Sequence, residues 1–115
     1  MGRYLVVENS ENNNKSISYL MADIIRDIAG NENFEGDWHL SIENVAKCVI
    51  AAKSLFDSDA KLRIYIDKHK DNYWATSNSL EEIKKYLWNI FGCLADNLAI
   101  AILYNKKFLT VWWEG

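Results

Sequence analysis

The chain has 115 residues with no proline, two cysteines and five scattered glycines. Cys48 and Cys93 are too few to form a disulfide framework, and both fall inside predicted helices. We therefore expect two reduced thiols that serve as packing residues. The scattered glycines form no glycine-rich phosphate loop, which argues against a nucleotide site of that kind.

Histidine is also scarce, and this bears on metal binding and catalysis. His39 and His69 are the only two, and neither has a cysteine or carboxylate beside it at metal-ligand spacing. A structural zinc ion needs about four ligands in register. Cys48 could pair with His39, but it lies beside an apolar helical stripe where a thiolate is hard to stabilise. We expect no metal, no cofactor and no catalytic residues, so the sequence does not indicate an enzyme.

Neither the charge of the chain nor its apolar runs indicate that it binds nucleic acid or inserts in a membrane. The net charge is −3, and the basic residues form only small clusters rather than a broad positive stripe. No apolar run approaches the roughly 20 residues needed to span a bilayer. The first residues lack the pattern of a signal peptide, and Val6 breaks the myristoylation pattern. The expected location is the cytoplasm.

The length fits one domain, residues 1–115, with a single core. The first half of the chain predicts a strand at residues 3–8, a polar loop at 9–15, and two helices. Apolar residues at helical spacing place the first helix at residues 16–29, with Gly30 as its left-handed C-cap. The second helix begins after the N-cap Ser41 and runs to Phe56.

In the middle of the chain, residues 61–67 (KLRIYID) alternate between apolar and polar side chains. Strict alternation predicts a strand, with Leu62, Ile64 and Ile66 facing inward. A polar turn and a second strand at residues 73–76 complete a hairpin. Ser79 and Glu82 then form a capping box that opens a third helix.

The end of the chain, residues 97–115, shows two apolar runs around a polar break. We interpret residues 98–104 and the run that begins at Phe108 as a hairpin at the centre of the sheet. The predicted fold is α+β, with about five mainly antiparallel strands and three helices in the order βααββαββ. The predicted core consists of Val6, Ile24, Val49, Ile64, Ile66, Leu87, Leu98, Ile100 and Ile102.

The charge distribution along the chain is uneven. Residues 8–37 contain seven acids and two bases, a local charge of −5, so the remainder carries +2. The loop at residues 31–40 (NENFEGDWHL) sets two aromatic residues among carboxylates. Aromatic anchors and steering charges together suit a basic protein partner. The predicted partner-binding residues are Asp23, Asp27, Glu32, Phe34, Glu35, Asp37 and Trp38.

Two alternatives to this surface stay open. Phe34 and Trp38 could fold back on the core, with the acids serving solubility alone. A second candidate surface is the exposed face of the predicted middle hairpin, formed by Arg63, Tyr65, Lys68, Lys70 and Trp74.

In size, acidity and the character of its NENFEGDW loop, the chain resembles the immunity proteins that bacteria carry against their own nuclease toxins, of the colicin and contact-dependent-inhibition kind. The resemblance implies one-to-one binding of a toxin domain and blockage of its basic active-site cleft. The expected function is thus a stoichiometric protein inhibitor. The alternatives are a phage- or plasmid-borne inhibitor of a host defence complex, and a small enzyme or ligand-binding domain.

Overall fold

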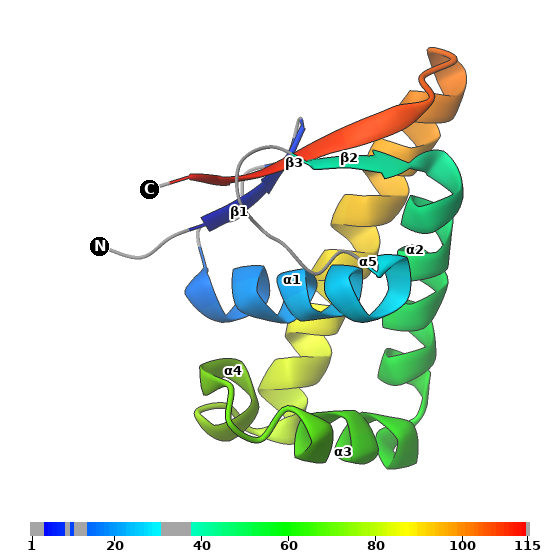
Figure 1. Ribbon diagram of the computed structural model, residues 1–115. Helices are drawn as coiled ribbons and strands as arrows, with labels where there is room; N and C mark the ends of the chain where they lie inside the picture. The colour runs from blue at the N-terminus through cyan, green and yellow to red at the C-terminus, as the bar shows by residue number, and fades with distance from the viewer. Residues whose placement is uncertain (1–3, 9, 11–13, 31–37, 115) are drawn as a thin grey trace.

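Figure 1 shows the computed structural model, which describes residues 4–8, 10, 14–30 and 38–114. Within these residues the chain forms three strands and five helices of an α+β fold. Their order is β1 (Tyr4–Val7), α1 (Lys15–Ala29), β2 (Trp38–Ser41), α2 (Ile42–Asp57), α3 (Asp59–Lys68), α4 (Tyr73–Thr76), α5 (Leu80–Leu103) and β3 (Phe108–Glu114).

The sheet has the order β1-β3-β2, and both outer strands run antiparallel to β3. Val111 of β3 is the register partner of Val7 on one side and of Trp38 on the other. Alternate side chains along each strand point to the same face. The buried face carries Leu5, Val7, Leu40, Leu109 and Val111.

Helix α1 lies between the sheet and the α3–α4 pair (Figure 1), and it contacts β1, α2, α4 and α5. It begins where the Asn14 side chain accepts hydrogen bonds from the backbone of Ser16 and Ile17. It ends at Gly30, whose φ of 71° is the left-handed conformation that glycine adopts without strain. Nine of the ten residues from Ser16 to Ile25 are buried, so other elements surround α1 on most sides.

Helices α2 and α5 make the most extensive contact between any two elements. Leu87, Ile90 and Leu94 of α5 are fully buried in the same core as Val45 and Cys48 of α2. Helix α5 is long and apolar enough to cross a membrane. The core helix of a soluble protein meets the same criterion of length and composition, so this is weak evidence.

Several predicted features are confirmed. β1 lies inside the predicted first strand, and Gly30 and Ser41 cap α1 and α2 as expected. The capping box of Ser79 and Glu82 opens α5 with both of its hydrogen bonds present. The final strand, β3, is central in the sheet.

The predicted count of five strands and three helices is wrong. Residues 61–67 lie in helix α3, and residues 73–76 form the short helix α4. Ser58, which directly follows α2, accepts a hydrogen bond from Lys61 N and so caps α3. Leu62, Tyr65 and Ile66 repeat at three and four positions, a helical spacing that the alternating pattern concealed.

The predicted strand at residues 98–104 is also wrong, because α5 continues without a break to Leu103. Neither proline nor a run of β-branched residues interrupts it, and its alanines favour helix. Asn97 donates to the backbone oxygen of Cys93 one turn earlier, which fits within the helix. The third strand of the sheet is instead β2, which was predicted as part of a loop.

These corrections change the predicted core. Val6, Ile24 and Leu87 are buried as expected, but Ile64 and Ile102 are exposed. The remaining members are partly buried: Val49, Ile66, Leu98 and Ile100.

A pair of substitutions in α3 tests the change from strand to helix. On a strand, Leu62 and Ile64 would share a face and tolerate truncation equally. On the helix, Leu62 is fully buried and Ile64 is 72% exposed. We expect Leu62→Ala to cost about 2–5 kcal/mol of unfolding free energy and Ile64→Ala less than about 0.5 kcal/mol, measured by denaturant unfolding. Equal costs would contradict the helix.

Candidate functional site

A buried carboxylate on α1 organises the most polar part of the interior. Asp23 is 6% exposed. One of its oxygens accepts hydrogen bonds from Trp74 Nε1 and from Asn72 Nδ2, each at 2.7 Å. The other oxygen accepts from Arg26 Nη1, also at 2.7 Å. Charge-assisted bonds of this kind are among the stronger ones in proteins, and three of them compensate the burial of the charge.

One turn later, Asp27 joins the same network from nearer the surface. Its Oδ2 accepts a hydrogen bond from the Tyr65 hydroxyl at 2.9 Å and lies 2.8 Å from His69 Nε2. Lys68 Nζ is 3.5 Å away. The rings of Tyr65, His69 and Trp74 pack against one another with centroid separations between 4.6 and 5.9 Å.

This geometry engages both nitrogens of the His69 ring. Nε2 lies 2.8 Å from Asp27 Oδ2, and Nδ1 lies 3.2 Å from the Asn72 amide nitrogen and 3.7 Å from Asp23 Oδ2. A general base needs a nitrogen within reach of a substrate proton. With both nitrogens occupied, the His69–Asp27 pair acts as a brace between α1 and α3.

The pKa values follow from the same contacts. Burial alone would raise the pKa of Asp27, but hydrogen bonds with His69 and Tyr65 and electrostatic attraction by His69 and Lys68 together hold it below its ordinary value. Burial, with the nearby Asp27 charge, raises the pKa of Tyr65, so its hydroxyl remains a donor.

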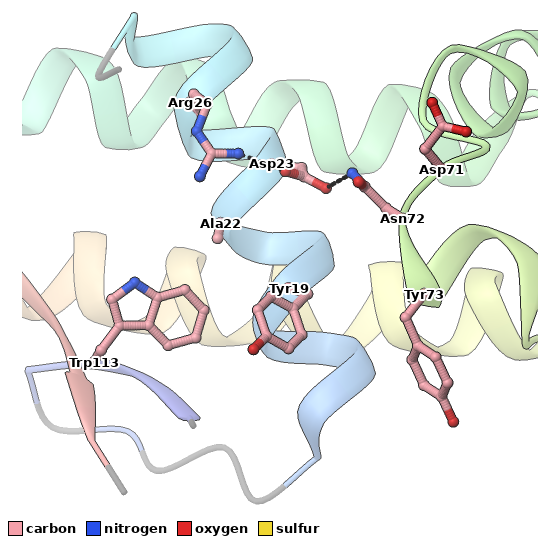
Figure 2. A pocket seen from close by; sticks show the side chains of 8 residues that line it. All are labelled: Tyr19, Ala22, Asp23, Arg26, Asp71, Asn72, Tyr73 and Trp113. Carbon is pink, nitrogen blue, oxygen red and sulfur yellow. Dashed lines mark hydrogen bonds and ion pairs between the residues drawn. The ribbon is translucent and has the colours of Figure 1, made fainter. Parts of the chain in front are cut away.

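A pocket of about 440 Å³ lies beside this network, between α1, residues 71–73 at the start of α4, and the end of β3. Figure 2 shows its lining: Tyr19 and Trp113 form an aromatic side, and the Asp23–Asn72 hydrogen bond forms part of the opposite side. The Tyr19 and Trp113 ring centroids are 5.3 Å apart. Both Asp23 oxygens already bind side chains of the protein, so the carboxylate that borders the pocket is committed to the fold.

The structure places three of the seven predicted partner-binding residues. Asp23 and Asp27 lie in the network above, and Trp38 is buried in β2 as a member of the hydrophobic core. For Trp38, this position agrees with the alternative in which it folds back on the core. Glu32, Phe34, Glu35 and Asp37 lie outside the described residues.

The second predicted surface is divided between two sides of α3. Tyr65, Lys68 and Trp74 contact the α1 carboxylates. Arg63 and Lys70 instead line a pocket of about 450 Å³ between α3, α4 and the start of α5.

The cysteines are placed as packing residues. Burial raises the pKa of the Cys48 thiol to about 11 and also raises that of Cys93. A thiol with a raised pKa is a poor nucleophile at neutral pH. Among the described residues no group of three or more potential ligands could hold a metal ion.

Four large apolar side chains lie exposed at one end of the molecule, where α5 ends and β3 begins. We call this group the apolar tip; Ile102, Leu103, Tyr104 and Phe108 are 59%, 77%, 74% and 46% exposed. Phe108 packs edge-on against the His39 ring, with centroids 4.6 Å apart. Lys106 donates its backbone N–H to Ala101 and its side chain to Glu8, which holds the turn in place.

The apolar tip was not predicted from the sequence, because residues 98–104 and the run from Phe108 were expected to form a buried central hairpin. A helical reading would have shown that Ile102 and Leu103 lie off the stripe formed by Leu87, Ile90, Leu94 and Ala101, all of which are buried. Exposed apolar patches on soluble domains commonly mark interaction sites.

Comparisons with protein-family models, curated proteins and solved structures found no match to this chain.

The lowered pKa of Asp27 gives a test of the network. A carboxyl group whose pKa is lower in the folded than in the unfolded protein stabilises the fold above its unfolded pKa. This stabilisation is lost as the pH falls through the lower, folded pKa. We expect the stability difference between the parent and Asp27→Asn to be largest near neutral pH and to shrink under acid conditions, below about pH 4.

Denaturant midpoints measured across this range check the expectation. Asp67→Asn, an exposed acid on α3, is the control and should change the midpoint little at any pH. A difference at Asp27 that does not vary with pH would show that the carboxylate does not stabilise the fold through its charge.

Proposed function

We propose that the protein is a stoichiometric inhibitor that binds another protein, of the toxin-immunity type, and that the apolar tip is its main anchor. The observation that carries the proposal is the exposure of four large apolar side chains at one end of the fold. Leaving them in water forgoes burial energy, and a partner that covers them recovers it.

The tip has the properties of a binding anchor. Tyr104 caps the C-terminal end of α5, and Phe108 begins the central strand of the sheet, so both side chains are carried by regular elements. Residues on rigid elements lose less conformational freedom on binding. Tyrosine and other aromatic residues are enriched among the side chains that dominate interface energetics.

Charge supports a basic partner. The chain carries a net charge of −3, and residues 8–37 contribute −5 of formal charge. A partner with a positive surface, such as a nuclease toxin domain, would be attracted at long range before the tip docks. The acids at positions 32, 35 and 37 would then contribute to the rate of association.

The site chemistry favours a binder over a small enzyme. Both nitrogens of His69 are engaged by the protein, and the Cys48 thiol has a raised pKa. An inhibitor of a host defence complex would bind a different target through the same kinds of contact. The identity of the captured protein distinguishes this function from that of an immunity protein.

Matched substitutions test the proposal. The protein is immobilised and used to capture its partner from the native host, and each variant is then titrated against that partner. We expect Tyr104→Ala and Leu103→Asp to weaken binding at least about tenfold, as loss of buried anchors does. The controls are Tyr73→Ala, which changes another exposed tyrosine, and Ile64→Asp, which changes another exposed branched aliphatic residue; both lie away from the tip.

The same titration separates the two surfaces. Reversal of Glu32, Glu35 and Asp37 to Lys should slow association and reduce its dependence on salt, while leaving dissociation nearly unchanged. If the tip variants bind like the parent while the charge reversals abolish binding, the tip is not the anchor. If no protein is retained at stoichiometric amounts, the inhibitor proposal itself fails.

A further inference from the structure

The apolar tip continues along the outer side of α5, opposite the buried stripe of the helix. Asp96, Ala99 and Leu103 follow one another at three and four positions, so their side chains share one side. All three are exposed, and Leu103 is itself a residue of the tip. Asp96 lies roughly 10 Å from Leu103 along the helix axis, because each residue of a helix advances about 1.5 Å. We call these three residues the outer strip.

Asp96 is the one charged residue in this part of the chain. Between Lys85 and Lys106 no other lysine, arginine, aspartate or glutamate occurs. Asp96 forms no ion pair with another described residue, whereas Lys106 pairs with Glu8. The outer strip therefore sets a single unpaired carboxylate in an otherwise uncharged stretch of helix.

The four side chains of the tip are too few to make a stable interface by themselves. A specific interface buries about 800 Å² on each partner and involves roughly 20–30 residues a side. A protein anchored on the tip must therefore cover neighbouring surface as well. The centres of interfaces are depleted in charged residues. The turn within the tip carries Lys106 and Lys107, so the uncharged outer side of α5 is the better continuation.

A protein that covers the outer strip removes Asp96 from water. A carboxylate that loses its water without gaining a partner is strongly unfavourable, and an opposite charge that also donates hydrogen bonds compensates this loss. Among the residues that the structure describes, none is paired with Asp96. The compensating group must then come from the bound protein.

We infer that the inhibited protein packs along the outer strip and places a lysine or arginine side chain on Asp96. This inference rests on the proposed function and adds the chemistry of the contact: an apolar patch over Leu103, with one basic side chain roughly 10 Å away. Ala99 lies between the two and has a side chain of one carbon, so the bound protein can approach the helix there. A basic side chain at this point agrees with the positive surface that the acidity of the chain favours.

Charge variants of Asp96 test the ion pair. Each variant is titrated against the protein that the immobilised parent retains from the native host, purified before use. Asp96→Asn keeps the shape of the side chain but removes its charge, and Asp96→Lys places like charges opposite one another. We expect Asp96→Asn to weaken binding at least about tenfold and Asp96→Lys to weaken it further, mainly through faster dissociation. Asp67→Lys, the reversal of an exposed acid on α3, is the matched control and should bind like the parent.

A larger side chain at Ala99 tests contact with the strip without changing any charge. Ala99→Tyr adds a ring at an exposed position, so it should keep the fold but weaken the complex at least about tenfold by blocking close approach. Ala60→Tyr makes the same change at an exposed position of α3 and should have no effect on binding. Denaturant midpoints near that of the parent confirm that each variant is folded.

The outcomes separate this inference from the proposed function. If the tip variants weaken the complex while the Asp96 variants bind like the parent, the inference is overturned and the tip remains the anchor. If Tyr104→Ala and Leu103→Asp also bind like the parent, the proposed anchor fails too. Sedimentation of the chain alone gives a further check. A dimer that Asp96→Lys and Ala99→Tyr both dissociate would show that a second copy covers the strip, which would also overturn the inference.

Discussion

The fold depends on how one buried negative charge is satisfied. Asp23 lies on the helix that the rest of the chain surrounds, and it binds Trp74 and Asn72 from the α3–α4 corner. An uncompensated buried carboxylate would cost several kcal/mol, so the corner must fold against α1 for the charge to be tolerated. Asp27 extends the same attachment through Tyr65 and His69. One face of α1 thus fixes the corner, while its apolar faces contact the sheet, α2 and α5 (Figure 1).

This arrangement decides which surfaces remain for partners. His69 and the two α1 carboxylates contact one another or residues of the α3–α4 corner. The longest helix, α5, is buried along one stripe only, which leaves its outer face and its end uncovered. The end of α5 carries the apolar tip, which we propose as the anchor for an inhibited protein. Acidic residues of the first third add long-range attraction for a basic partner.

Local signals in the sequence located the parts of the fold that depend on local physics. The sequence predicted three helix caps, Gly30, Ser41 and Ser79, and the apolar stripes of α1 and α2. These features are predictable because a helix end and a buried helix face each need specific residues nearby. Residues 61–67 alternate in polarity yet form a helix, because Ser58 caps it and Tyr65 reaches Asp27, a contact 38 positions distant in sequence. Leu98 to Leu103 read equally well as a buried strand or as the end of a helix. The acids Asp23 and Asp27 looked like surface charges because Tyr65, Asn72 and Trp74, which bind them, come more than 35 positions later.

The coupling between Asp23 and Trp74 tests the central claim most directly. A double-mutant cycle with Asp23→Asn, Trp74→Phe and the combined variant measures it from unfolding free energies. Trp74→Phe removes the Nε1 donor while retaining an aromatic ring in the core. A hydrogen bond from a buried indole to a carboxylate predicts a coupling of about 1.5–3 kcal/mol. A coupling below about 0.5 kcal/mol, with the two single costs simply adding, would contradict the account that this carboxylate holds the α3–α4 corner to the rest of the fold.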